Sequence, residues 1–354
     1  MSYFRGGIFM KAFYFSDFNK VELREVEKPT IVNDTDVIVK VSLTALCGSD
    51  VHIVKGVIPS EPGFILGHEY VGIIEQVGSS VKNFKPNDRV IGPPAPFCRV
   101  CENCLKGNFS HCVKGSSLNV HGSKNLDGVH AEYVRVPFAD MCLKHVPDNI
   151  DDEEAVMVFD ILSTSYSAVK RTNIKPGDNV VIMGAGPIGL SSILTSKLYN
   201  PNKIILVGRK DLFRMNKAKE IGATHIINAS KSDVLKQVYE LTDGKGADVV
   251  IEASGSEIAI QQAVECAGIG GRVSLIGIGA DILFPLSEIF CKNLNITMGL
   301  GDLNLASDLL NLIASKKIDV KPLITHRVSL DEIHRAYNIF DKRTEDVIKI
   351  LIRP

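Results

Sequence analysis

A histidine and a glutamate stand side by side in this chain, and together they could bind one divalent metal. His68 offers a neutral nitrogen and Glu69 a hard oxygen, in a segment with glycines at both ends, residues 67–72. Zinc accepts both kinds of donor. Such a pair is weak evidence alone, because a histidine next to a glutamate is usually a hydrogen-bonded surface pair. Cys47 lies upstream and adds a thiolate, another common zinc ligand.

A reactive zinc site needs a third protein ligand and one open coordination position. The candidates are Asp160, Glu69 as an additional ligand, and three cysteines, Cys142, Cys266 and Cys291. Asp160 is favoured because it is a lone carboxylate in an apolar helical run, residues 155–162. A buried carboxylate is costly unless it is paired or bound to metal. We therefore predict that Asp160 completes the site.

Four further cysteines have the spacing C-x2-C-x2-C-x7-C and are Cys98, Cys101, Cys104 and Cys112. Thiolates this close in sequence can close a tetrahedral zinc site with no position left for substrate. The surrounding residues, 93–125, show no regular apolar pattern, so a metal would replace the missing core. Free thiols and an iron–sulfur cluster are the alternatives. The spacing favours a structural zinc.

An apolar strand at residues 180–183 runs into a G-x-G-x-x-G motif and then a helix. The motif comprises Gly184, Gly186, Pro187, Ile188 and Gly189. These glycines allow a tight turn and close approach of the pyrophosphate, which the helix N-terminus faces. Because strand, turn and helix are all present, the segment predicts a dinucleotide-binding site rather than an ordinary glycine turn.

In dinucleotide-binding folds, residues at the end of the next strand contact the cofactor's ribose. NAD enzymes usually have an acidic residue there, which accepts hydrogen bonds from the 2′-hydroxyl. This chain instead has Gly208, Arg209 and Lys210. Arginine grips phosphate well, so NADP is predicted rather than NAD, with Arg209 as the main partner of the 2′-phosphate. The alternatives are that these cations are solvated, or that Asp211 reaches the ribose in a shifted register.

The elements that position these residues change in character along the chain. Alternating apolar residues predict antiparallel strands from Met10 to about Leu46, then in 66–90 and 130–136. Acidic residues 151–154 open a helix that is predicted to continue through Val169. Strands and helices then alternate, and the strands are predicted at 179–183, 203–207, 225–227, 247–251, 272–276 and 295–298. This alternation indicates a parallel sheet, so the chain is predicted to be α/β.

The bulk composition excludes some classes of function. The chain has 354 residues, of which 45% are hydrophobic, and a formal net charge of −1. This length favours two domains, and the charge argues against nucleic-acid binding. No apolar run is long enough to cross a membrane, and the first residues lack the apolar core of a secretory signal. We expect a cytoplasmic protein whose eight cysteines bind metal rather than form disulfides.

The combined motifs resemble the zinc-dependent medium-chain alcohol dehydrogenase family. The resemblance covers nearly the whole chain from Met10 and rests on the Cys47 segment, the four cysteines, the nucleotide motif and the pattern formed by Gly67, His68, Glu69, Gly72, Gly78 and Val81. It implies a GroES-like catalytic domain from residues 1–162 and 301–354, with the structural zinc lobe at 93–125. It also implies a Rossmann NADP-binding domain at 163–300, and a homotetramer, with a dimer as the alternative.

Asp160 and the turn with Gly208 and Arg209 are most similar to the NADP-dependent secondary alcohol dehydrogenases. That branch implies a catalytic zinc on Cys47, His68 and Asp160, with Glu69 as a fourth, exchangeable ligand. The chain differs from that branch in keeping the complete set of four cysteines, and Arg99 stands where this lobe often has glycine.

The resemblance also implies roles for three residues that follow Cys47. Ser49 would pass the substrate's hydroxyl proton outward, with His52 further along the path, and Asp50 would hold the second nitrogen of His68. The predicted reaction is hydride transfer between NADP(H) and a secondary alcohol, ketone or aldehyde. The alternatives are a polyol dehydrogenase of the sorbitol dehydrogenase type and a non-catalytic protein that binds NADP as a signal.

Overall fold

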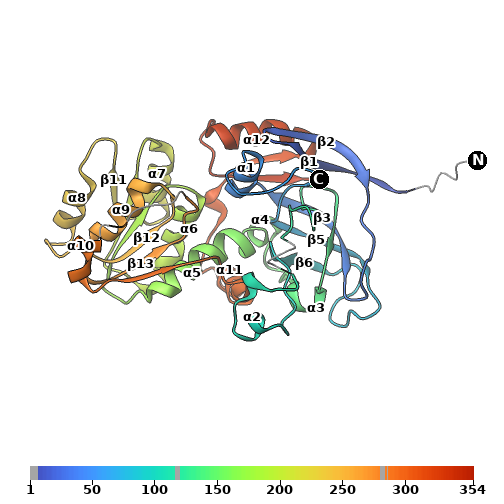
Figure 1. Cartoon of the computed structure of the whole chain (residues 1–354), viewed down its shortest axis with the longest axis horizontal. Coiled ribbons are helices and arrows are strands. Elements are labelled where there is room, and N and C mark those ends of the chain that lie inside the picture. Colours follow the sequence, from blue (N-terminus) through green and yellow to red (C-terminus); the bar gives the residue numbers. More distant parts are fainter. Residues whose placement is uncertain (1–6, 116–119, 280–283, 285) are drawn as a thin grey trace, which may run out of the picture. The chain divides into compact units, whose positions relative to one another are not determined.

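The computed structural model describes residues 7–115, 120–279, 284 and 286–354, which divide into two compact units (Figure 1). The first unit contains residues 1–160, 303–314 and 324–354, and the second contains residues 161–302 and 315–323. We expected all of residues 301–354 in the first domain. The structure instead groups residues 301–302 and 315–323 with the second unit.

The first unit is rich in β-structure. A three-stranded sheet has the order β2-β1-β4, and its strands are Lys20–Glu27, Phe9–Asp17 and Phe64–Ile65. A seven-stranded sheet has the order β15-β16-β3-β5-β6-β8, with β7 paired to β3. Its strands are β3 (Val37–Ala45), β5 (Tyr70–Val77), β6 (Arg89–Gly92), β7 (Tyr133–Val136), β8 (Lys144–His145), β15 (Ile324–Ser329) and β16 (Lys349–Arg353).

Short helices connect and cover these strands. They are α1 (Gly48–Val54), α2 (Glu102–Leu105), α3 (Ala139–Cys142), α4 (Asp152–Ala155), α11 (Ala306–Ala314) and α12 (Ile333–Lys342). One apolar core of the unit joins Phe13 and Phe15 of β1 to Ile333 and Ala336 of α12, so the C-terminal segment packs against the start of the chain. This packing brings β16 next to the segment that precedes α1.

The second unit is a six-stranded parallel sheet with the order β11-β10-β9-β12-β13-β14. Its strands are β9 (Asn179–Met183), β10 (Lys203–Gly208), β11 (His225–Asn228), β12 (Ala247–Glu252), β13 (Ala267–Leu275) and β14 (Asn295–Met298). The central strands are buried and consist mainly of valine, isoleucine and leucine, as expected when helices cover both faces.

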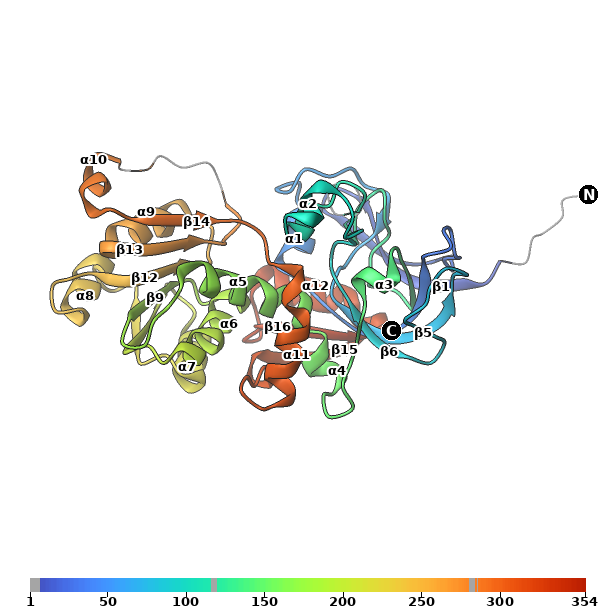
Figure 2. The same ribbon diagram turned by 90° about the horizontal axis from the view of Figure 1, so that it is seen from below.

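Helices pack on both faces of this sheet (Figure 2). The helices are α5 (Ser163–Thr172), α6 (Pro187–Ser196), α7 (Leu212–Ile221), α8 (Val234–Leu241), α9 (Glu257–Cys266) and α10 (Leu286–Ile289). Helices α5, α6 and α7 form one layer, and α8 and α9 form the other. The predicted α/β architecture with a parallel sheet is therefore confirmed.

The predicted helix from residue 151 to Val169 was wrong in one respect. It is interrupted, because α4 ends at Ala155 and a five-residue π-helix follows, η2 (Val158–Leu162), before α5 begins. The predicted strand at 130–136 is also shorter, since β7 starts at Tyr133. Among the described residues, no helix is long and apolar enough to cross a membrane.

Candidate zinc and cofactor sites

The four cysteines of residues 98–112 lie together, buried and without disulfides. Cys98 and Cys112 have their Sγ atoms 3.5 Å apart, and those of Cys101 and Cys112 are 3.9 Å apart. A tetrahedron with zinc–sulfur bonds of about 2.3 Å has edges of about 3.8 Å. Backbone N–H groups lower the pKa of Cys101 to about 6, which favours the thiolate. These four side chains fit a closed zinc site, and we call residues 93–125 the four-cysteine lobe.

Arg99 lies between two of these cysteines and adopts a left-handed backbone conformation, with φ of 56°. Its guanidinium stacks over the rings of Phe97 and Phe109 and donates a hydrogen bond to the carbonyl of Met141. A glycine would adopt this φ without strain. The arginine instead connects the lobe to α3 of the same unit.

A second group of possible metal ligands consists of Cys47, His68, Glu69 and Asp160, whose donor atoms all lie within 4.8 Å of one another. We call it the mixed-ligand site. Cys47 is the residue before α1, and His68 and Glu69 lie between β4 and β5. Asp160 is the middle residue of the π-helix η2, whose wider turn is a common feature of functional sites. The fold thus brings together the four residues that the sequence singled out.

Three acidic donors lie close together in the mixed-ligand site. The Cys47 thiol lies 3.2 Å from a carboxylate oxygen of Asp160. Burial raises the pKa of Cys47, and the charge of Asp160 raises it further. Burial also opposes ionisation of Asp160, but a hydrogen bond from His68 lowers the pKa of that carboxyl below its ordinary value. A divalent cation would stabilise the thiolate and both carboxylates, so the donor set fits zinc.

Glu69 is held by a buried cation that the sequence analysis missed. Its Oε1 atom lies 2.5 Å from Nζ of Lys349, which also donates to the carbonyl of Leu46 at 2.8 Å. Burial would lower the pKa of Lys349, but the Glu69 carboxylate raises it above its ordinary value. The other oxygen of Glu69 is buried without a hydrogen-bond partner. Glu69 can therefore offer that oxygen to a metal while it stays paired to Lys349.

A sequence signal for Lys349 was available. Lys349 is a lone charge in the apolar run of residues 347–352, which is the same pattern that singled out Asp160. The run reads as a buried strand, and β16 is buried along residues 349–352. Only the three-dimensional structure connects it to Glu69, because 280 residues separate the two.

The three residues expected to act beside the metal occupy the first turns of α1. Ser49 has its hydroxyl 3.3 Å from Nε2 of His68. Asp50 faces the other nitrogen, with Oδ1 3.5 Å from Nδ1 of His68. Burial would raise the pKa of Asp50, but the imidazoles of His68 and His130 lower it. This arrangement leaves Nε2 of His68 for the metal, since Asp160 lies 3.8 Å from that atom.

His52 lies further along α1, three residues after Ser49. Partial burial lowers its pKa, and the neighbouring charges of Arg343 and Lys55 lower it further. The imidazole is therefore biased toward its neutral form, which can accept a proton.

The nucleotide motif forms the turn between β9 and α6 in the second unit. Gly184 has a φ of 104°, and a Cβ on Gly189 would lie 1.9 Å from the carbonyl oxygen of Gly184. Those two glycines are required by the turn and by close packing. Gly186 is the N-cap of α6, Pro187 begins the helix, and a Cβ on Gly186 would meet nothing within 4 Å. Open space at a helix N-terminus fits a pyrophosphate.

The end of β10 carries the residues expected to read the ribose. A Cβ on Gly208 would lie 2.6 Å from Met215 of α7, so packing also requires this glycine. Arg209 and Lys210 are exposed in the turn that follows. Asp211 caps α7 through the backbone N–H of Arg214 and pairs with its guanidinium at 3.1 Å. Asp211 is thereby engaged, whereas Arg209 and Lys210 face solvent.

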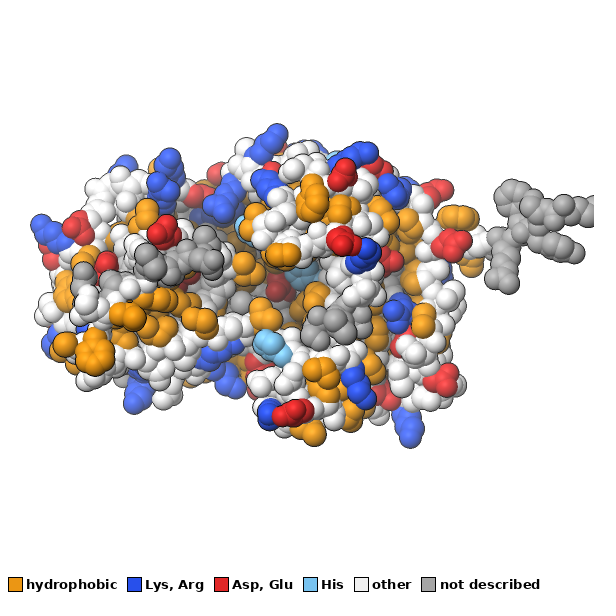
Figure 3. Space-filling model, viewed as in Figure 1, with side chains coloured by type: hydrophobic (Ala, Val, Ile, Leu, Met, Phe, Trp, Pro, Cys, Tyr) orange, Lys and Arg blue, Asp and Glu red, His pale blue; other side chains and the backbone are white. Residues whose placement is uncertain are grey.

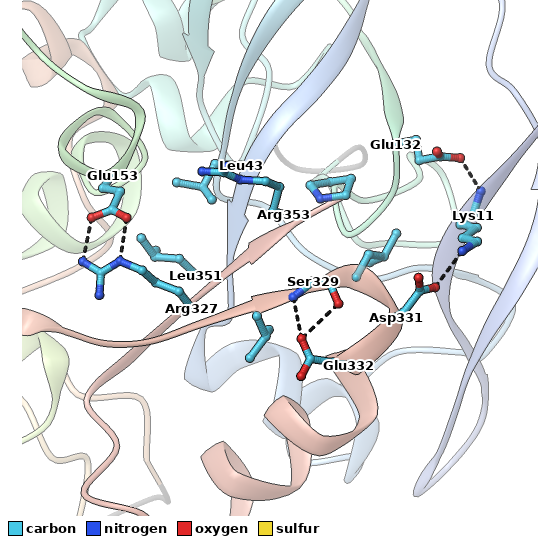
Figure 4. Close-up of a pocket in the computed structure, with 13 residues that line it drawn as sticks. Lys11, Leu43, Glu132, Glu153, Arg327, Ser329, Asp331, Glu332, Leu351 and Arg353 are labelled. Carbon is cyan, nitrogen blue, oxygen red and sulfur yellow. Dashed lines mark hydrogen bonds and ion pairs between the residues drawn. The ribbon is translucent and has the colours of Figure 1, made fainter.

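A pocket of about 600 Å³ elsewhere in the first unit contains none of these site residues. Two pairs of its charged residues bind each other. Glu153 and Arg327 form two bonds of 2.6 and 2.7 Å, and Lys11 lies 2.7 Å from Asp331 (Figure 4). Its lining residues include neither cysteine nor histidine, so it lacks the sulfur and nitrogen donors of the mixed-ligand site.

Comparisons with known proteins agree with both parts of the fold. Residues 33–148 match the family model of the alcohol dehydrogenase GroES-like domain, and residues 187–315 match that of zinc-binding dehydrogenases. The NADP-dependent isopropanol dehydrogenase of Clostridium beijerinckii is 35% identical over 97% of this chain and 99% of its own. The sorbitol dehydrogenase of Bacillus subtilis is 31% identical over 98% of this chain and 97% of its own.

A solved structure extends this agreement to the whole fold. The zinc dependent alcohol dehydrogenase 2 from Streptococcus pneumonia is 38% identical, with a TM-score of 0.90 over 97% of this chain and 98% of its own. Together the matches define a zinc-binding dehydrogenase built from a GroES-like and a Rossmann-like part. The chain belongs to the zinc-dependent medium-chain alcohol dehydrogenase family and is an oxidoreductase.

Proposed function

We propose that this protein transfers hydride between NADP(H) and a secondary alcohol or the corresponding ketone, with a catalytic zinc at the mixed-ligand site and a structural zinc in the four-cysteine lobe. The proposal rests on one observation. The donor atoms of Cys47, His68, Glu69 and Asp160 all lie within 4.8 Å of one another. Three of these donors are acidic and one is a histidine. A closed cysteine site could not present substrate to a metal, whereas this mixed set leaves room for it.

The residues around this site would handle the proton of the substrate. A bound zinc supplies Lewis acidity, which lowers the pKa of an alcohol hydroxyl toward about 7. The Ser49 hydroxyl lies beside Nε2 of His68, where it can accept the substrate's proton and donate its own onward. His52 is biased toward its neutral form and can receive that proton. Asp50 holds the Nδ1 side of His68.

Two substrate classes remain to be separated. The similarity to an isopropanol dehydrogenase favours a small secondary alcohol, and the similarity to a sorbitol dehydrogenase supports a polyol as the alternative. Initial rates should be measured with 2-butanol, sorbitol and xylitol on protein of measured zinc content. The proposal expects the highest kcat/KM for 2-butanol. A higher value for either polyol would replace the proposed substrate with the alternative, and absence of turnover with all substrates would overturn the enzymatic assignment.

We propose a preference for NADP because exposed cations follow Gly208. Asp211 is engaged with Arg214, so the turn offers Arg209 and Lys210 to the ribose. Arg209→Ala should lower kcat/KM for NADPH about 10- to 100-fold, the size of one lost charge-assisted hydrogen bond, and leave NADH unchanged. The matched control is Lys219→Ala, which removes an exposed cation from α7. Equal losses with both cofactors would contradict the role of Arg209.

We propose that the protein assembles into a homotetramer, with a dimer as the alternative. The exposed sheet edge of the second unit supports this proposal. Strand β14 is at the end of the sheet order and pairs with β13, and large apolar side chains lie exposed on and near it. They include Leu286, Phe290 and Met298, and hydrophobic side chains gather on one face of this unit (Figure 3). Unpaired edges and apolar patches favour association. Light scattering on Phe290→Asp should detect a smaller assembly than the wild type.

The proposed location is the cytoplasm. None of the eight cysteines forms a disulfide in the structure, as is usual in a reducing compartment.

A further inference from the structure

His130 is a fully buried histidine that contacts Asp50, the residue beside the metal-binding His68. It lies just before β7, and its ring occupies the space over Gly67, the residue before His68. A Cβ added to Gly67, whose φ is 94°, would lie 2.6 Å from the ring. The backbone of His130 is also fixed, because its N–H donates to Leu66 and its carbonyl accepts from Phe13. The ring therefore has little freedom to move.

The hydrogen bonds of this ring have a defined direction. The hydroxyl of Thr44 lies 2.7 Å from the backbone carbonyl of Glu69 and 2.9 Å from Nδ1 of His130. A carbonyl oxygen can only accept, so the hydroxyl donates to Glu69 and accepts from Nδ1. The other ring nitrogen, Nε2, lies 3.3 Å from Oδ2 of Asp50. A carboxylate also only accepts, so Nε2 is the donor of that contact, and with both nitrogens donating the ring carries both of its N–H protons.

Asp50 connects the fixed ring of His130 to the proposed metal ligands. Its Oδ2 atom accepts from His130 and, at 2.9 Å, from the backbone N–H of Cys47. Its Oδ1 atom faces Nδ1 of His68 at 3.5 Å. Rotating the carboxylate would break both contacts of Oδ2, so those two donors fix the direction in which Oδ1 points. The direction of Oδ1 in turn selects the nitrogen of His68 that remains for the metal.

We propose that His130 is a positioning residue of the catalytic zinc site. It holds Asp50 in the orientation that keeps the Nδ1 proton of His68 toward Asp50 and the Nε2 lone pair toward the metal. Thr44 closes the network by joining His130 to the backbone of Glu69. This inference rests on the proposed assignment of zinc to the mixed-ligand site. Groups that orient metal-binding histidines commonly change metal affinity about 10- to 100-fold when removed.

The test compares three substitutions in the zinc-loaded, full-length protein. His130→Phe keeps a ring over Gly67 and removes both donors. His130→Gln places an amide nitrogen near the position of Nε2 and can still donate to Asp50. His130→Asn places a donor near the position of Nδ1 and reaches only Thr44. The rate of zinc transfer to a chelator is measured, and zinc leaving the four-cysteine lobe is the internal reference.

We expect His130→Phe to release the catalytic zinc about 10- to 100-fold faster, with the lobe unaffected. His130→Gln should restore most of the wild-type rate, and His130→Asn should not. The visible spectrum of the cobalt-substituted site should shift in the Phe and Asn variants only. Zinc release at the wild-type rate from His130→Phe would overturn the proposal. Slow release restored by Asn but not by Gln would also overturn it, because zinc retention would then depend on the contact with Thr44. If the Phe variant does not fold, the Gln and Asn variants still decide between these outcomes.

A matched control separates this role from general core packing. His121→Phe removes another buried imidazole, whose Nδ1 contacts the carbonyl of Asp127 rather than Asp50. It should release the catalytic zinc at the wild-type rate, and faster release would count against a specific role of His130. Wild-type protein with zinc only in the lobe would instead refute the proposed function, so the two failures are distinguishable.

Discussion

The four-cysteine lobe takes its donors from residues 98–112, whereas the mixed-ligand site takes its donors from residues 47, 68, 69 and 160. In the lobe, all four ligands are cysteines held by short turns and backbone N–H groups. In the mixed-ligand site, the ligands differ in charge and are contacted by Lys349, Asp50 and Ser49. A site that only stabilises can be held by its ligands and the nearby backbone alone. A site that reacts also needs groups that orient the ligands and balance charge.

The strongest test of this comparison removes one ligand from the lobe. Cys104→Ser should lose the structural zinc, whose binding typically contributes about 10 kcal/mol or more. Since the lobe has little apolar core, we expect limited proteolysis to cleave it at least about 100-fold faster. Zinc analysis should show one ion lost per chain and the catalytic ion retained in protein that stays folded. Cys291→Ser changes an exposed cysteine and is the control. Cleavage at the wild-type rate would mean that the lobe folds without metal.

The next test removes a ligand from the mixed-ligand site. Asp160→Asn should lower kcat about 1000-fold, because several kcal/mol of Lewis-acid stabilisation are lost. The catalytic zinc should be lost, the lobe zinc should stay, and protease resistance should not change. Asp148→Asn, at an exposed position, serves as the control. Wild-type zinc content together with wild-type turnover in Asp160→Asn would disprove the assignment.

A smaller effect is expected from the cation that balances the mixed-ligand site. Lys349→Met leaves the carboxylate of Glu69 buried without its partner and should lower the free energy of unfolding by about 3 kcal/mol. Adding Glu69→Gln should recover most of that loss, because the uncompensated charge is removed. The exposed pair of Lys55 with Asp341 provides the control, and Lys55→Met should cost at most about 1 kcal/mol. Equal losses for the two lysines, measured by urea unfolding, would show that Lys349 carries no special charge-balancing role.

The same contrast explains how much the sequence could predict. The spacing of the four cysteines and of the nucleotide glycines is local, so the residues and their chemistry could be read directly. The parallel strands were also predictable, because each is a short apolar run bounded by turns. Lys349 and His130 could not be assigned to the metal site, since their contacts join residues up to 303 positions apart. Each was visible as a polar residue in an apolar segment, but its partner depends on the fold.

The break in the predicted helix at 151–169 was missed for a related reason. A π-turn has no strong pattern of residue types, because it differs from an α-turn by one extra residue rather than by composition. The acidic start at 151–154 was correctly predicted, since Asp151 and Glu154 form a capping box at α4. The site therefore depends on a backbone irregularity that propensity cannot detect.

The π-turn at Val158–Leu162 has a consequence for how such a site can arise. One residue in a helix corresponds to about 100° of rotation, so a single inserted residue can turn a side chain from one direction to another while the flanking helical segments remain intact. Deleting Val158 should therefore convert the turn to an ordinary helical one and point Asp160 away from Cys47 without altering any ligand. In evolutionary terms, one codon gained or lost at this turn could switch metal chemistry on or off in an otherwise unchanged protein.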